Sequence, residues 1–223
     1  MLMNELIPSF FVGISQTLIG HPFDTIKVLM QNKQKWIGLP IKQYYYGWRS
    51  PLISGSIFNC TVFPIYQYSL KYTNNNFISG MIGGIVVTPS VYFFDIFKIN
   101  EQVKNPINLS IFKKPYYGSI MTFNREVLAM GSYFGSYYYF KDEKKCSILL
   151  SGGLAGLINW TLTYPLDVIR SRQIAQNISV KEALKQKKLW SGYSACAFRA
   201  IIVNASSFYI YEIMKKYCEE KIK

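Results

Sequence analysis

The chain has 223 residues, of which 50% are hydrophobic and 17% charged, with a formal net charge of +13. This balance excludes a disordered chain, and the scattered Lys and Arg residues lack the stripe or motif of a nucleic-acid-binding protein. Four dispersed cysteines and one histidine offer no zinc site. No phosphate-binding loop, nucleophile elbow or carboxylate pair indicates an enzyme, so we expect no catalysis, metal or cofactor.

Six long apolar segments follow one another along the chain, each long enough to cross a bilayer as a helix and poor in charges at its centre. The glycine clusters at 80–84 and 152–156 predict close helix packing. We therefore expect an all-α membrane protein with both termini on one side, and a soluble all-α bundle is the alternative. The predicted helices are 6–31, 50–72, 77–102, 119–141, 147–173 and 194–217.

Three similar segments divide the chain into units of two helices: HPFDTIK (21–27), YFFDIFK (92–98) and YPLDVIR (164–170). Each places an aspartate three residues before a cation, and each is followed by an aromatic-rich turn ending in glycine. The aspartate–cation pair and the turn glycine recur together in three copies. This predicts one domain of three repeats, about 1–74, 75–144 and 145–223. The markers are Asp24/Lys27/Gly47, Asp95/Lys98/Gly118 and Asp167/Arg170/Gly192.

The positive charge belongs to the segments that join the two helices of each repeat. Residues 27–49, 98–118 and 170–192 hold 15 Lys and Arg against two acids, a net of +13, and the rest of the chain is neutral. Such an asymmetry is typical of the side retained by positive-inside orientation and facing anionic lipid. The charge therefore predicts topology rather than substrate.

These repeats resemble the mitochondrial carrier family, whose signature is Pro-x-[Asp/Glu]-x-x-[Lys/Arg] at the end of each odd-numbered helix. The prolines are present as Pro22 and Pro165, whereas Phe93 occupies that position in the second repeat. The resemblance implies six transmembrane helices in three pseudosymmetric repeats around a central cavity. It also implies a monomeric, multi-pass antiporter of the mitochondrial inner membrane, with cardiolipin bound at the glycine turns Gly47, Gly118 and Gly192.

By the same resemblance, the three aspartates and three cations form a gate on the matrix side. A buried charge needs a partner, and the family arrangement predicts pairs between neighbouring repeats. In the family, a glutamine seven residues after each aspartate braces the ion pair. Gln31 and Gln102 occupy this position in the first two repeats, whereas in the third repeat it is Ile174, with Gln173 adjacent. The predicted pairs are Lys27–Asp95, Lys98–Asp167 and Arg170–Asp24.

A second gate is implied on the cytoplasmic side by the motif [Phe/Tyr]-[Asp/Glu]-x-x-[Lys/Arg] of the even helices. It is complete in the sixth helix alone, so few ion pairs are expected to hold this gate. The third joining segment also contains a predicted short helix, with Ser179 and Glu182 spaced as a capping box. The gate positions are Tyr66 and Gln67, then Tyr137, Tyr138 and Lys141, then Tyr211, Glu212 and Lys215.

Within the family, the likeness is greatest to carnitine/acylcarnitine and basic amino-acid carriers, through GHPFDTIKV (20–28) and SGGLAGLINWTLTYPLDVIRSR (151–172). Arg125 and Glu126 match the substrate-selecting pair of the fourth helix, and Arg199 matches the sixth-helix contact. Glu126 suits an ammonium and an arginine suits a carboxylate, which predicts a zwitterionic or cationic amino acid or a carnitine-like solute. His21 is either a cavity residue or a packing residue, whereas Trp160 is expected to pack.

Several alternatives remain at this stage. Arg125 and Glu126 also fit a static brace between helices, and the surplus of arginine fits a nucleotide or deoxynucleotide. The missing proline and the short joining segments fit a carrier-like membrane protein without transport. Residues expected to line either cavity are Tyr133, Asn59 and Asn204. The Lys-, Ile-, Asn- and Tyr-rich composition is typical of AT-rich genomes, and for a viral protein the membrane would be the host's.

Overall fold

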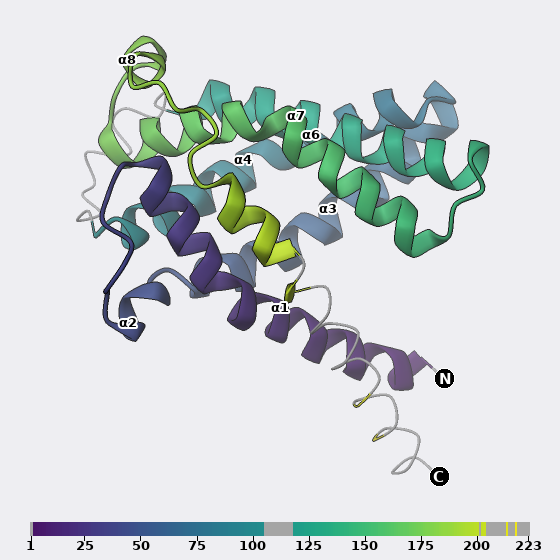
Figure 1. The fold of residues 1–223 in the computed structure, drawn as a ribbon. Coiled ribbons are helices and arrows are strands. Elements are labelled where there is room, and N and C mark those ends of the chain that lie inside the picture. The colour runs from purple at the N-terminus through teal and green to yellow at the C-terminus, as the bar shows by residue number, and fades with distance from the viewer. Residues whose placement is uncertain (1, 105–117, 201, 204–212, 214–216, 218–223) are drawn as a thin grey trace.

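The structure, a computed structural model, describes residues 2–104, 118–200, 202–203, 213 and 217. Every regular element within these residues is helical, and the long helices occupy the predicted apolar segments (Figure 1). The sixth predicted helix is described over residues 193–200 and 202–203. The elements are α1 (Leu2–Gln31), α2 (Ile41–Tyr44), α3 (Arg49–Thr73), α4 (Asn76–Gln102), α6 (Ser119–Tyr138), η1 (Tyr139–Glu143), α7 (Ile148–Gln176) and α8 (Val180–Lys185).

Polar side chains mark where several of these helices begin. The Asn75 side chain accepts from the backbone N–H groups of the first turn of α4, and Ser147 does the same for α7. The predicted capping box of α8 is confirmed, since Ser179 and Glu182 each bond the other's backbone N–H. α3 and α7 each end at an asparagine in the left-handed conformation, Asn74 and Asn177.

Close packing of α4 on α6 holds the second repeat together. A Cβ atom built on Gly80 would lie 2.4 Å from the Met130 carbonyl oxygen, and one on Gly84 would lie 2.5 Å from that of Glu126. The prediction of close approach is therefore confirmed for α4. Among the described residues no atom of another element lies within 4 Å of such a Cβ on the α7 glycines at 152, 153 and 156, so close packing there stays a prediction.

The charged signature residues lie between two apolar clusters along the same helices. One cluster includes Val87 of α4 and Phe134 of α6, and the other includes Ile99 of α4 and Leu29 of α1. Among the described helices, α4 is long and apolar enough to span a membrane, with a mean hydropathy of 1.7 over its most apolar stretch. α4 also runs unbroken past Phe93, and Pro89 inside it removes a backbone donor one turn earlier.

Candidate functional site

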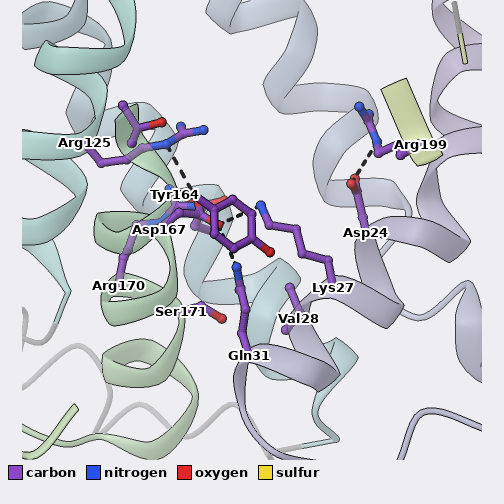
Figure 2. Close-up of polar contacts among 12 residues, drawn as sticks. Asp24, Lys27, Val28, Gln31, Arg125, Tyr164, Asp167, Arg170, Ser171 and Arg199 are labelled. Atoms are coloured by element: carbon purple, nitrogen blue, oxygen red, sulfur yellow. Dashed lines mark hydrogen bonds and ion pairs between the residues drawn. The ribbon is translucent and has the colours of Figure 1, made fainter. Parts of the chain in front are cut away.

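The six signature charges form three ion pairs between repeats, and Figure 2 shows that of Lys27 with Asp167. The pairing predicted from the sequence is wrong in direction, because each cation bonds the aspartate of the preceding repeat rather than that of the following one. Lys27 Nζ lies 2.7 Å from Asp167 Oδ2, and Lys98 Nζ lies 3.0 Å from Asp24 Oδ2. In the third pair, Arg170 Nη1 contacts Asp95 Oδ2.

The reason for the reversal lies in helix geometry. Residues three apart are separated by about 60° around the helix axis, so the aspartate and the cation of one helix face two different neighbours. Which neighbour lies on which side depends on the handedness of the ring, and that handedness is a tertiary property. The spacing of the motif therefore predicts membership of the ring but leaves its direction open.

The charge ring, defined as the six signature residues of the three pairs, encloses very little space. A cavity of about 30 Å³ lies among these side chains, room for one or two water molecules. Gln31 Nε2 donates to Asp167 Oδ2 at 2.8 Å, which places a brace beneath the Lys27 pair. Gln102 instead donates to the Thr25 hydroxyl at 3.1 Å. Arg170 also bonds Asp167 of its own helix, at 2.9 Å.

Arg125 and Glu126 lie next to this ring, on α6. They form an ion pair with each other, and the Glu126 side chain is fully buried. Arg125 Nε lies 3.8 Å from Asp167 Oδ1, and Arg170 Nη1 lies 3.7 Å from Glu126 Oε1. The two predicted substrate residues are therefore electrostatically coupled to the third repeat's half of the ring, at distances where burial leaves charges poorly screened.

Trp160, expected to serve in packing, contacts cations from both groups. Lys27 Nζ lies 4.4 Å from the centre of its ring system, and the guanidinium carbon of Arg125 lies 5.3 Å from it. Both distances are within the range of cation–π attraction. The sequence offers no signal for this role, because an apolar helix contains tryptophan equally well for packing.

A cavity of about 220 Å³ opens beside the Arg125–Glu126 pair, between α3, α4 and α6. Its lining combines charged and apolar side chains. Neither Arg199 nor His21 lines it. The lining residues are Ser54, Gly55 and Phe58 of α3, Val91 and Asp95 of α4, and Arg125, Glu126 and Met130 of α6.

Arg199 and His21 lie on the first repeat's side of the ring. Arg199 Nε contacts Asp24 Oδ1 at 2.8 Å (Figure 2). Asp24 therefore holds both Arg199 and Lys98. His21 is buried, and its Nε2 donates to the Tyr46 carbonyl oxygen at 2.8 Å. That contact with the first joining segment is the one expected of a packing residue. Asn59 and Asn204, predicted to line the cavity, lie outside the residues whose side chains are described.

Arg172 lies two residues after the third signature cation and has a structural role that the motif does not predict. Its side chain is fully buried, and all four of its described partners are backbone carbonyls. Nε donates to Gln31 at 2.8 Å, while the two terminal nitrogens donate to Ala183, Lys187 and Lys188. Arg172 thus ties the end of α7 to the end of α1 and to the C-terminal carbonyls of α8, where a cation is favourable.

Most of the predicted cytoplasmic gate residues that the structure describes contact aromatic rings. The Tyr66 ring is buried and stacks on Phe134 at 3.9 Å, while its hydroxyl donates to Asn76 Oδ1 at 2.5 Å. Lys141 lies over the rings of Tyr137 and Tyr138, and Gln67 is exposed. The remaining gate positions, Tyr211, Glu212 and Lys215, lie outside the described residues.

The three turn glycines share one conformation and one type of contact. Gly47, Gly118 and Gly192 have φ angles of +79°, +88° and +87°, a region that favours glycine. A Cβ on Gly47 would lie 3.1 Å from the Lys98 carbonyl oxygen, and one on Gly192 would lie 3.0 Å from that of Lys27. Gly118 lies against the helix turn that carries the third repeat's cation, with Ile174 nearest. Lipid binding at these turns stays a prediction.

Comparison with known proteins gives one consistent result. A family model described as "Mitochondrial carrier protein" matches residues 143–221. The mitochondrial arginine transporter BAC2 of Arabidopsis thaliana is 26% identical over 94% of this chain and 90% of its own length.

Two human relatives cover similar shares. The mitochondrial carnitine/acylcarnitine carrier protein of Homo sapiens is 25% identical over 96% of this chain and 94% of its own length. The human mitochondrial basic amino acids transporter is 25% identical over 88% of this chain and 84% of its own length. These matches, together with three aspartate–cation motifs in one charge ring, support the mitochondrial carrier family, a family of transporters rather than enzymes, as the family that this chain resembles.

Proposed function

We propose that this protein carries a small zwitterionic or cationic metabolite across the mitochondrial inner membrane by alternating access. In this proposal the long helices α1, α3, α4, α6 and α7 and the helix that begins at residue 193 are the six spans. The three repeats of about 1–74, 75–144 and 145–223 surround the substrate path. The charge ring is the gate on the matrix side, and its ion pairs break when the gate opens.

The observation that carries the proposal is the buried pair Arg125–Glu126 at the edge of the charge ring. Ionised side chains inside a membrane protein are costly and mark a substrate pathway by default. Here the pair contacts both Asp167 and Arg170. A substrate bound to the pair therefore changes the electrostatic balance of the gate itself, which is what transport by alternating access requires.

Local charge neutralisation favours this substrate class over a nucleotide. Arg125 is paired with Glu126, and Arg199 is paired with Asp24. The surplus of arginine that favours a phosphorylated substrate on sequence grounds is thus cancelled by neighbouring carboxylates. Among the described lining residues of the cavity, Arg125 is the one cation, and its pairing with Glu126 leaves no free cation for a polyanion.

Uptake by proteoliposomes tests the proposal. The purified protein is reconstituted, and exchange is measured for carnitine, lysine, arginine, ornithine and nucleotides. We expect uptake of at least one amino acid or carnitine-like solute, with nucleotides inactive. Uptake of nucleotides and of no other compound would show that the substrate is a nucleotide rather than an amino acid or a carnitine-like solute. Folded protein that transports none of the panel would overturn transport and leave a carrier-like membrane protein.

A further inference from the structure

The three interfaces between neighbouring repeats differ in chemistry on the side of the charge ring that faces the joining segments. At the interface of the first and third repeats, buried side-chain hydrogen bonds join the end of α1 to the end of α7. Asn32 Nδ2 donates to the Ser171 hydroxyl at 3.0 Å, and Gln176 Nε2 donates to Asn32 Oδ1 at 3.1 Å. Asn32 and Ser171 are both buried, and satisfied buried bonds of this kind make a contact rigid.

Further bonds extend these contacts to the third joining segment. Gln186 Nε2 donates to Gln176 Oε1 at 2.5 Å, and the Ser191 hydroxyl donates to the Met30 carbonyl oxygen at 2.8 Å. Arg172 bonds one backbone carbonyl of α1 and three at or just beyond the end of α8. The polar network therefore links α1, α7 and α8, and it is defined as Asn32, Ser171, Arg172, Gln176, Gln186 and Ser191.

The threefold repeat identifies the equivalent positions at the other two interfaces. Asn32 lies eight residues after the first signature aspartate, and Ser171 lies four residues after the third. At the other two interfaces, the residues at these spacings are apolar and are buried in one cluster. They are Val103 and Val28 between the first and second repeats, and Ala175 and Ile99 between the second and third.

The brace positions and the chain connections follow the same division. Gln102 makes one bond across the first–second interface, to the Thr25 hydroxyl, whereas Ile174 at the second–third interface belongs to the apolar cluster. The chain connects consecutive repeats, passing from α3 to α4 and from α6 through η1 to α7. The polar network thus joins the two repeats that are not consecutive in the sequence.

Polar and apolar interfaces respond differently to movement. A hydrogen bond needs its donor and acceptor about 3 Å apart and well aligned, so a small slide between two helices breaks several bonds of a network together. Apolar contacts have no preferred direction, and packed helices slide over them in shear movements. We infer, resting on the transport function proposed above, that the first and third repeats move as one rigid unit and that the gate opens around the second repeat.

The charge ring has the same division. The Lys27–Asp167 pair lies within the rigid unit, and Gln31 braces it by donating to the same carboxylate oxygen. The second repeat is held by the other two pairs, which Lys98 and Asp95 make with the first and third repeats. Opening around the second repeat therefore breaks these two pairs and leaves the braced pair intact.

Reversible cross-links across each interface test the inference. Two cysteines are introduced at equivalent positions of one interface, a short bis-methanethiosulfonate reagent links them, and dithiothreitol removes the link. Free thiols counted after denaturation give the linked fraction. The unaltered protein, treated in the same way, controls for its four native cysteines. The variants are Asn32→Cys with Ser171→Cys, Val28→Cys with Val103→Cys, and Ile99→Cys with Ala175→Cys.

Uptake of the substrate found in the proteoliposome panel is compared before linking, after linking and after reduction. Because turnover requires the gate to open, we expect linking to lower uptake roughly tenfold or more at both apolar interfaces, with recovery on reduction. The linked Asn32→Cys/Ser171→Cys protein should stay within about twofold of its unlinked rate, since its link lies inside the rigid unit.

A second pair at the first–third interface guards against misfolding. If Asn32→Cys with Ser171→Cys already lowers uptake before linking, Met30→Cys with Ser191→Cys repeats the test with the same expectation. These two residues lie at the half-exposed edge of the same interface, so their replacement leaves the buried bonds of Asn32 in place.

Each outcome decides between the inference and the broader function. A linked first–third pair that blocks uptake, with recovery on reduction, would overturn the rigid unit. Uptake that survives complete linking at either apolar interface would overturn opening around the second repeat. If the folded, unaltered protein takes up no compound of the panel, the transport function fails and this inference fails with it.

Discussion

Replacing Gly84 with alanine tests the close contact between α4 and α6. The added Cβ would lie 2.5 Å from the Glu126 carbonyl oxygen and 2.9 Å from its carbonyl carbon. Both are backbone atoms, so no rotamer change relieves the clash. The helices must separate by roughly 1 Å to reach an ordinary contact, and such overpacking costs about 1–3 kcal/mol.

The neighbouring glycine supplies a matched control. A Cβ on Gly83 would lie 3.7 Å from the nearest atoms, both of Val62, which is ordinary van der Waals contact. Both substitutions gain the same helix propensity, about 1 kcal/mol, so their difference isolates the clash. We expect Gly83→Ala to keep or raise the Tm of the detergent-solubilised protein. Gly84→Ala should lie several degrees below it, at about 2–4 °C per kcal/mol.

Transport measurements extend the same comparison. Because Gly84 packs against the backbone of Glu126, Gly84→Ala should also reduce uptake of the substrate found in the proteoliposome panel, whereas Gly83→Ala should not. A Gly84→Ala protein as stable and as active as Gly83→Ala would refute the packing of α4 on α6 described here.

Three further predictions follow from the charge ring and its matrix side. A double-mutant cycle of Asp24→Asn and Lys98→Gln should give a coupling of about 0.5–3 kcal/mol in thermal stability, and the coupling of Lys98→Gln with Asp167→Asn should be smaller. Arg172→Gln should destabilise the protein by roughly 1–3 kcal/mol, because buried carbonyls lose their donor. Bonds from Ser179 hold the pKa of Glu182 below its ordinary 4.5, so α8 should be fully stabilised above that value and lose stability as the pH falls through the lower folded pKa.

Controls for these three measurements are available within the chain. Coupling of Lys98 to Asp167 rather than to Asp24 would restore the pairing expected from the family arrangement. The exposed Arg49 is the control for Arg172, and equal Tm values for Arg49→Gln and Arg172→Gln would contradict the anchoring role. Limited proteolysis of the third joining segment between pH 7 and 3 measures α8, and Glu182→Gln should abolish its pH dependence.

The helices and the membership of the charge ring were predictable from the sequence, since both are local patterns. Apolar length and the flanking turns place α4 at 76–102 against a predicted 77–102. The triplicated spacing of aspartate and cation likewise identifies all six ring residues. These signals need no knowledge of how the repeats are arranged.

What the sequence could not predict depends on that arrangement. The direction of the ion pairs requires the handedness of the ring. Phe58, Val91 and Met130 look like any apolar residues of a membrane helix, and only the arrangement of three helices shows that they line one cavity. Arg172 is an intermediate case. Its position two residues after Arg170 is visible in the sequence, but its backbone partners depend on the fold.

The contacts of the turn glycines bear on how such a protein arises. Gly47 contacts the second repeat, Gly118 the third, and Gly192 the first. This is the head-to-tail, heterologous type of interface, and a threefold rotation closes it into a ring. A solitary ancestral repeat could make none of these contacts within itself, whereas three separate copies could make them all. These contacts do not themselves require the covalent links between repeats, so we expect fragments separated between residues 144 and 145 to reassemble when co-expressed.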